Sequence, residues 1–360
     1  MRNSTLASLA AAFLVLSGGF AERASGEELR EFYRGARAQA MGNAFVGLAD
    51  DEQAIFLNPA GLAGLKRYGV QYFIADIEGS TDILAAAQNR AAYNNLSGDT
   101  LNEVMGKNIY GRVQLTPSFT MPNFGISVIV DGQAAVLAKN QALPQIVLGD
   151  QMTNGLQFAW GQSVMRARAK SKHDLRVGVG GKLLWRRGGY RLLSLTQMMN
   201  VSRDSLQEIV GKYQRGYGID FGLQYLRTVN SRLKIGWGLV WTDIGDTKFG
   251  TGPDPIKSNM ATGIAATYQL PKLSTTLLYD YRHLLETADW KKKSHAGVEF
   301  ALPMISVYAG ISQAFFTYGA SFDAWIFKVT ALSYAEEQGS YVQDDTERRF
   351  MLRLALKVGL

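Results

Sequence analysis

Apolar and polar side chains alternate along this chain in stretches of roughly ten residues. In 350–360 every even position is apolar, and the odd positions are Met351, Arg353, Ala355, Lys357 and Gly359. Because successive side chains of a strand point to opposite faces, one face of this stretch is hydrocarbon and the other carries cations and small residues. The same pattern recurs at 175–186, 217–225, 233–242 and 273–282.

Stretches of this length are what a tilted strand needs to cross the hydrocarbon of a membrane. A soluble sandwich shows the same alternation with its apolar side chains inward, so periodicity alone does not separate the two folds. The number of stretches favours a transmembrane antiparallel β-barrel, an all-β fold of about fourteen strands, because bacterial barrels have an even number. We expect strands near 68–77, 111–121, 124–138, 154–166, 175–190, 216–228, 232–243, 259–270, 273–284, 294–303, 304–313, 316–323, 325–337 and 348–360.

The connections between these strands alternate in length. Those after even-numbered strands are short: 122–123, 229–231, 271–272 and 303–304. Those after odd-numbered strands are mostly long: 78–110, 139–153, 191–215, 244–258 and 338–347. Barrels have short periplasmic turns and long outer loops, so the pattern places the C-terminus at the periplasm. The short link after 304–313 and the turn 166–174 depart from it, and helical spacing in 83–105 and 202–213 predicts loop helices.

The start of the chain is typical of an export signal. Arg2 precedes the uncharged apolar run 6–16, and small residues before Glu22 allow cleavage there. We therefore expect a cleaved signal peptide at 1–21 and export to the outer membrane of a Gram-negative cell. The remaining chain has no long uncharged apolar run, which argues against helical membrane spans. It has no Cys, and its net charge of +7 is not clustered as in a nucleic-acid groove.

The segment before the first strand does not alternate. It is rich in Gly and Ala and contains an Asn-Pro turn signal. Small residues let a backbone pack closely, and a barrel of this size has room inside, so we expect a plug at 22–67 and the barrel at 68–360.

This segment resembles the N-terminal region of the FadL-like outer-membrane transporter superfamily, which includes the long-chain fatty acid transporters and the PorV and PorQ barrels of type IX secretion. The residues that carry the resemblance are Arg37, Met41, Gly42, Asp50, Asp51, Asn58, Pro59, Ala60 and Gly61. The resemblance implies a fourteen-stranded barrel closed by an N-terminal hatch. In the transporter branch, a hydrophobic molecule enters as the hatch shifts and leaves sideways through the wall. The final residue departs from the family, because such barrels usually end in an aromatic and this chain ends in Leu360.

The sequence offers little support for catalysis. His173, His283 and His295 lie in unrelated turns and strands, with no nucleophile motif and no metal-ligand spacing. His295 and Glu299 share a strand face, and a satisfied pair inside the barrel is the simpler interpretation. We therefore expect a protein that is not an enzyme, with no cofactor and no metal.

The inward faces of the predicted strands collect charged residues: Arg176, Lys182, Arg186, Asp220, Lys234, Asp280, Arg282, Glu299, Arg353 and Lys357. One interpretation is a network of ion pairs that braces wall and hatch. The other is that surplus cation attracts a carboxylate such as a fatty-acid head group.

Two functions follow from this pattern. The first is passive uptake of a hydrophobic small molecule, which requires an apolar pocket between hatch and wall. The alternative is a PorV- or PorQ-like scaffold or carrier for protein secretion or a surface complex. Outer-membrane lipid, a hydrophobic ligand and secreted or surface proteins are the expected partners, and nucleic acid is not. A diffusion porin is disfavoured, because the N-terminal segment would occlude the lumen.

Overall fold

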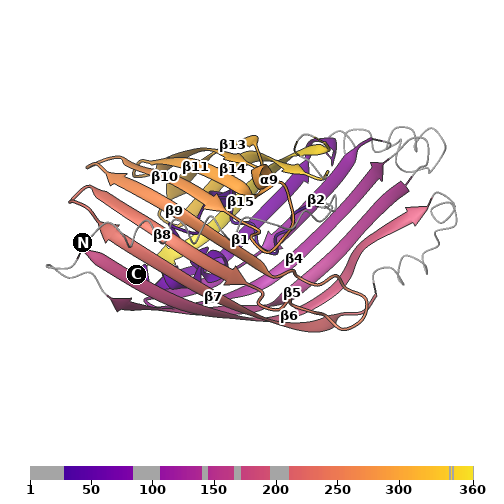
Figure 1. The fold of residues 1–360 in the computed structure, drawn as a ribbon, viewed down its shortest axis with the longest axis horizontal. Coiled ribbons are helices and arrows are strands. Elements are labelled where there is room, and N and C mark those ends of the chain that lie inside the picture. Colours follow the sequence, from indigo (N-terminus) through magenta and orange to yellow (C-terminus); the bar gives the residue numbers. More distant parts are fainter. Residues whose placement is uncertain are drawn as a thin grey trace, which may run out of the picture.

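The strands form one closed antiparallel barrel, as the alternation predicts (Figure 1). Neighbours in the wall follow the order of the chain, and β1 pairs with β15 from Gly69↔Gly359 to Ser80↔Arg349, which closes the ring. This architecture is seen in a computed structural model, which describes residues 28–83, 106–139, 145–165, 172–194, 211–339, 342 and 344–359.

Every predicted strand is present. The strands are β1 (Gly69–Ser80), β2 (Asn108–Leu115), β3 (Ser118–Met121), β4 (Phe124–Lys139), β5 (Gln145–Met165), β6 (His173–Ser194), β7 (Gln214–Thr228), β8 (Leu233–Thr242), β9 (Asn259–Gln269), β10 (Ser274–Tyr281), β11 (Ser294–Ala301), β12 (Ile305–Ser312), β13 (Phe315–Ala324), β14 (Phe327–Glu337) and β15 (Thr346–Gly359). Both β2 and β3 pair with β1 and with β4, so together they act as one interrupted strand of the wall. Counted in this way, the wall has fourteen strands.

Alternation along the strands puts apolar side chains outside. On β10, Leu277 and Tyr279 are exposed, whereas Thr276, Leu278 and Asp280, which alternate with them, are buried. A water-soluble barrel would have the opposite arrangement, and an apolar outer face is the one that fits a bilayer. Among the described residues, no helix is long and apolar enough to cross a membrane.

The two ends of the barrel differ. Short turns join the strands at one end, here called the turn end, and the long connections lie at the other, the loop end. The wall is also uneven in height, because β5 has 21 residues and β6 has 22, whereas β10, β11 and β12 have 8 each. At the loop end, only β12 and β13 are joined by a tight turn, in which Gln313 and Ala314 take positive φ values of 52° and 68°. That geometry matches a two-residue hairpin and explains the short link that departed from the length pattern.

The sequence underestimated β5 and β6 at the loop end, where β5 begins at Gln145 rather than at 154 and β6 ends at Ser194 rather than at 190. Most of the expected helices at 202–213 and 83–105 lies outside the described residues, as does the expected signal peptide at 1–21; residues 211–213, which are described, are not helical.

Candidate functional site

Residues 28–65 run inside the barrel, and we call them the inner segment. It contains α2 (Ala36–Ala40), α3 (Ala54–Leu57) and the 3-10 helix η1 (Pro59–Gly64). Its apolar side chains are removed from solvent: Ala38, Met41, Phe45, Ile55 and Leu62 are all 0% exposed. In Figure 1 the indigo turns of this segment lie between the walls.

Wall glycines form the seat of the inner segment. An added Cβ would collide with the inner segment at Gly125, Gly161, Gly178, Gly222, Gly238, Gly297 and Gly310, and at Gly319 it would lie 3.2 Å from the Cβ of Ala40. They come from β4, β5, β6, β7, β8, β11, β12 and β13, so the contact surrounds the segment. Gly42 contributes from the other side, because its φ is +68° and its Cβ position is occupied by backbone of β11 and β12. Backbone therefore packs directly on backbone over much of the lumen.

The Asn-Pro element of the sequence motif builds a tight local structure. The side chain of Asn58 accepts a hydrogen bond from the Ala60 N–H at 3.2 Å and donates to the Val46 carbonyl at 3.0 Å. This caps η1, while Pro59 stands at its first position, where a missing N–H has no consequence. Gly61 is required because a Cβ there would meet the backbone of Ala49.

The Arg and Asp residues of the motif form one cluster. Arg37 donates to both oxygens of Glu299 on β11, at 3.0 and 2.6 Å, and also to Asp50 and Asp51. Glu299 is thus the wall partner of the motif, whereas His295 on the same face interacts with the Gly42 carbonyl through Nδ1 at 2.9 Å. The two residues do not pair with each other; each one contacts the inner segment.

Most of the charged residues that were predicted to face inward form hydrogen bonds or ion pairs with the inner segment or with other wall residues. Asp280 accepts from the N–H groups of Phe45 and Val46 at 2.7 and 2.8 Å. Arg353 donates to both oxygens of Asp76 at 2.6 and 2.7 Å and to the Tyr33 hydroxyl at 3.1 Å. These contacts join the inner segment to β10, β15 and β1.

The other predicted charges fall into three groups. Lys182 pairs with Asp220 at 3.0 Å and with Asp243 at 2.6 Å, fully inside the barrel. Arg176 pairs with Asp174 at 2.8 Å and Lys357 with Asp323 at 2.6 Å, both within the wall. Lys234 is exposed near the turn end of β8.

Residues 28–34 cross the lumen at the loop end, attached on several sides. Glu28 pairs with Arg349 at 2.7 Å and with Arg34 at 2.8 Å. The Phe32 carbonyl accepts from Arg112 at 2.6 Å, and Arg30 stacks 3.5 Å from the centre of the Tyr190 ring. Sequence reasoning missed these contacts, since Glu28, Arg34 and Arg349 lie outside the motif and the alternating stretch considered for lumen charge.

Glu31 attaches the same stretch to the connection after β10. It pairs with Arg282 at 2.9 Å and with His283 at 3.4 Å, and His283 also faces Glu286 at 3.5 Å. Burial acts to raise the pKa of Glu31, but the charges of Arg282 and His283 and the hydrogen bonds of His283 and Asn43 together outweigh it and hold the pKa well below its usual range. Burial acts to lower the pKa of His283, but hydrogen bonds with Glu286 and Glu31 outweigh it and raise that pKa.

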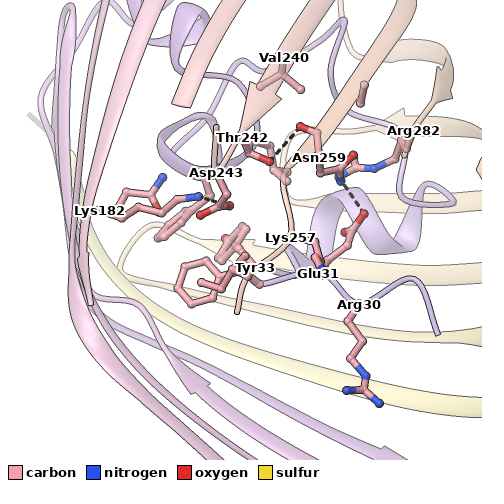
Figure 2. Close-up of a pocket in the computed structure, with 16 residues that line it drawn as sticks. Arg30, Glu31, Tyr33, Lys182, Val240, Thr242, Asp243, Lys257, Asn259 and Arg282 are labelled. Atoms are coloured by element: carbon pink, nitrogen blue, oxygen red, sulfur yellow. Dashed lines mark hydrogen bonds and ion pairs between the residues drawn. The ribbon is translucent and has the colours of Figure 1, made fainter. Parts of the chain in front are cut away.

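Two cavities adjoin residues 30–32. The outer cavity, at the loop end, has a volume of about 1,020 Å³ and mixes charged residues with apolar ones such as Leu29, Leu137 and Leu192. The inner cavity, of about 40 Å³, lies on the other side (Figure 2). There Glu31 meets Arg282 and Lys182 meets Asp243, next to Val240 and Tyr33. The extended apolar pocket that the sequence led us to expect is thus replaced, in the described part, by an amphipathic cavity above a filled lumen.

Arg186 differs from the other charges that line the outer cavity. It is 4% exposed, donates to the Thr153 hydroxyl at 2.9 Å and to the Asp254 carbonyl at 2.9 Å, and stacks on Phe249. Within the described residues it has no carboxylate in ion-pair contact. Asp131, Asp243 and Asp254 interact with this buried guanidinium from beyond contact distance and offset only part of the cost of burying it. An anion in the cavity would offset more.

The wall is irregular where β1 meets β2 and β3. Gln71 pairs with Ser118 and Ala75 with Leu115, so three residues of β1 face only Thr116 and Pro117. Pro117 has no N–H, and the Thr116 N–H to the Ile74 carbonyl is the one bond across this interval. β1 also shifts register against β15 between Val70 and Phe73. The inward hydroxyls of Thr116 and Ser118 are buried with no partner in the described part of the chain.

No protein-family model matches this chain, and no curated protein matches it. Among solved structures it is similar to the Pseudomonas putida toluene transporter TodX, at 10% identity and a TM-score of 0.45 over 92% of this chain and 99% of the other. A TodX monoaromatic hydrocarbon channel deltaS2 mutant gives 11% and 0.47 over 91% and 97%. The Ralstonia pickettii toluene transporter TbuX gives 10% and 0.44 over 90% and 98%. Likeness at this level carries no argument about function.

Proposed function

We propose that this protein is an outer-membrane barrel for passive uptake of hydrophobic small molecules. The observation that carries the proposal is a lumen filled at its centre by the inner segment, below an amphipathic cavity of about 1,020 Å³ at the loop end. A filled lumen does not suit a diffusion pore. A cavity with apolar lining suits the capture of a ligand with a hydrophobic body.

The inner segment acts as the hatch in this proposal. Its part seated on the wall glycines stays fixed, because backbone contacts leave no room to slide. Residues 28–34 are held by side-chain contacts, and they separate the outer cavity from the inner one. A ligand therefore passes by displacing this stretch.

The irregular junction of β1 with β2 and β3 is the proposed exit. One hydrogen bond spans the interval that includes Pro117, so opening the wall there breaks little of the sheet. Elsewhere a side opening would break several ladder bonds at once, each of which is expensive to leave unmade in an apolar medium. Lateral release into the bilayer suits a hydrophobic ligand.

Arg186 is the proposed contact for a ligand with an anionic head group. Its guanidinium lines the outer cavity without a carboxylate partner in the described part, and the apolar residues beside it would receive the hydrocarbon. We expect Arg186→Gln to weaken binding of a long-chain carboxylate roughly tenfold or more and to leave a neutral hydrocarbon unaffected. Lys257→Gln, on an exposed side chain of the same cavity, is the control.

The proposal is tested by uptake of labelled hydrophobic compounds into proteoliposomes that contain the full chain. We expect uptake above that of empty liposomes, without steady conductance in planar bilayers. A large open-channel conductance, or uptake no faster than in empty liposomes, would refute the transport function. Tight copurification of a single protein with no bound lipid would point instead to the scaffold function.

A further inference from the structure

The outer surface of β5, β6 and β7 carries a basic and aromatic patch near the loop end. It consists of Arg187 and Arg215, which face outward, together with Tyr213, Met152 and Asn154. The wall register sets them side by side, because Arg187 lies opposite Met152, Trp185 opposite Asn154, and Arg215 opposite Trp185. Figure 1 shows these three strands as neighbours along the lower wall.

The patch is organised around Tyr213. Its ring lies 5.2 Å from the guanidinium carbon of Arg187, and its hydroxyl accepts from the Asn154 amide at 3.3 Å. The hydroxyl also contacts the Met152 sulfur at 3.4 Å. The tyrosine thus fixes the position of the guanidinium on the outside of the wall.

Neither guanidinium group has an oxygen acceptor among the described residues. Arg187 donates only to the Met152 sulfur, at 3.5 Å, which is a weak acceptor, and its Nε is buried without a partner in the described residues. Arg215 is exposed and makes no ion pair within the same part of the chain. Asp150 is the nearest outward carboxylate on β5, and no ion pair joins it to Arg187. Two adjacent guanidinium groups without acceptors favour a phosphate, whose oxygens accept paired N–H bonds.

The height of the patch on the wall is informative. The outward apolar positions of β6 run from Leu175 to Trp185, about 33 Å along the strand. At a tilt of about 40° this corresponds to about 25 Å, which is the height of the apolar band of such barrels. Arg187 is therefore the first outward residue beyond the band at the loop end. Arg227 takes the corresponding position at the turn end of β7.

We propose that this patch binds the phosphorylated head group of an outer-leaflet glycolipid. The proposal rests on the placement of the barrel in the outer membrane with its loop end outward, as in the proposed function. The acyl chains lie along the apolar band below, over Leu183 and Tyr217, while Arg187 and Arg215 hold a phosphate. The bound lipid then covers the outer face of the wall at β5 and β6, its longest strands.

The test is native mass spectrometry of the full-length protein in detergent with added bisphosphorylated lipid A. We expect retained lipid, and a loss of apparent affinity on the order of tenfold or more in the double variant R187Q/R215Q. Arg227→Gln, the same change on the same outward face at the turn end, should retain wild-type binding. Heat-dependent migration on gels checks that each variant is folded.

Two further binding measurements identify the chemical group that the patch recognises. Dephosphorylated lipid A should bind at least tenfold more weakly, and inorganic phosphate at millimolar concentration should not displace the lipid. Wild-type binding by R187Q/R215Q, equal loss in Arg227→Gln, equal binding of the dephosphorylated lipid, or displacement by phosphate alone would each overturn the proposal. Because binding is measured without transport, a failure here is separate from a failure of the uptake function.

Discussion

At the scale of single residues, Asp280 joins wall and inner segment through two short hydrogen bonds. The carboxylate is fully buried and accepts from two neighbouring N–H groups. We expect Asp280→Asn to destabilise the folded barrel by about 1–3 kcal/mol, because both N–H groups donate to Oδ2 and the amide replaces this charged acceptor with an uncharged oxygen. Urea unfolding in micelles measures this change.

Asp323→Asn is the matched control for that prediction. Asp323 also pairs with a cation, Lys357 at 2.6 Å, but both side chains are about one third exposed. Such pairs contribute about 0–1 kcal/mol. An equal loss of stability in the two variants would contradict the assigned role of Asp280.

His283 makes the attachment of residues 28–34 depend on pH. Its pKa is raised in the folded protein, so the stabilisation is complete below its ordinary value and is lost as the pH rises through the raised one. Glu31 stays ionised throughout this range, since its pKa is lowered. We expect a spin label at Arg30→Cys, the single thiol in this chain, to be more mobile at about pH 9 than at about pH 6.

The variant His283→Asn provides the comparison for the spin-label measurement. It should remove the difference in mobility between the two pH values, because the lowered pKa values of Glu31 and Glu286 keep both carboxylates ionised in that window. A difference that persists in His283→Asn would assign the effect to another group.

Several residue roles could be read from the sequence and others could not. Asn58, Pro59 and Gly61 form a local motif, and local backbone geometry is encoded in neighbouring residues. The wall partner of Arg37 is 262 positions away at Glu299, and nothing in either neighbourhood marks the pairing. The attachment through Glu28 and Arg349 is of the same long-range kind, which is why it appears only in the folded structure.

At the scale of elements, the seat of the inner segment predicts that its central part does not move during uptake. The Cβ position of Gly319 on β13 lies 3.2 Å from the Cβ of Ala40 in α2, slightly less than the roughly 3.5–4.5 Å of a disulfide. It also lies 2.8 Å from the Cβ of Leu332 on β14, so a small shift of the wall must accompany the substitution, and heat-dependent migration on gels checks that G319C is folded. In A40C/G319C, oxidation should therefore leave ligand uptake unchanged. Each single variant shows whether the substitutions alone affect uptake.

A loss of uptake on oxidation of A40C/G319C, reversed by reduction, would show that α2 must move. In that case the glycine contacts would be a resting position, and residues 28–34 would not be the sole moving part.

Strand positions were predictable because lipid imposes the alternation. The prediction failed where lipid is absent: the extensions of β5 and β6 stand beyond the apolar band, so their outward faces need not be apolar. The split of 111–121 into β2 and β3 has two causes, Pro117 and the extra residue of β1 opposite it. Pro117 can be seen in the sequence, whereas the extra residue of β1 appears only in the strand register.

At the scale of the whole molecule, the inner segment is what keeps the barrel from being a pore. Deletion of residues 28–65 leaves the wall glycines facing an empty lumen. We expect this variant to conduct ions in planar bilayers, as wide barrels do, whereas the full chain does not. A deletion variant that folds by heat-dependent migration but conducts no more than the full chain would contradict this role.

The seat of the inner segment also has a consequence for biogenesis. Residues 36–63 precede the first strand, yet the wall glycines that contact them lie on β4 to β13, and α2 also contacts β14 and β15, far along the chain. Contacts of such long sequence separation form slowly, since loop closure must come before them. The segment therefore lacks its contacts until most of the wall has been inserted. The machinery that assembles the barrel then has to pair β1 with β15 while the inner segment, which is continuous with β1, already lies inside the ring.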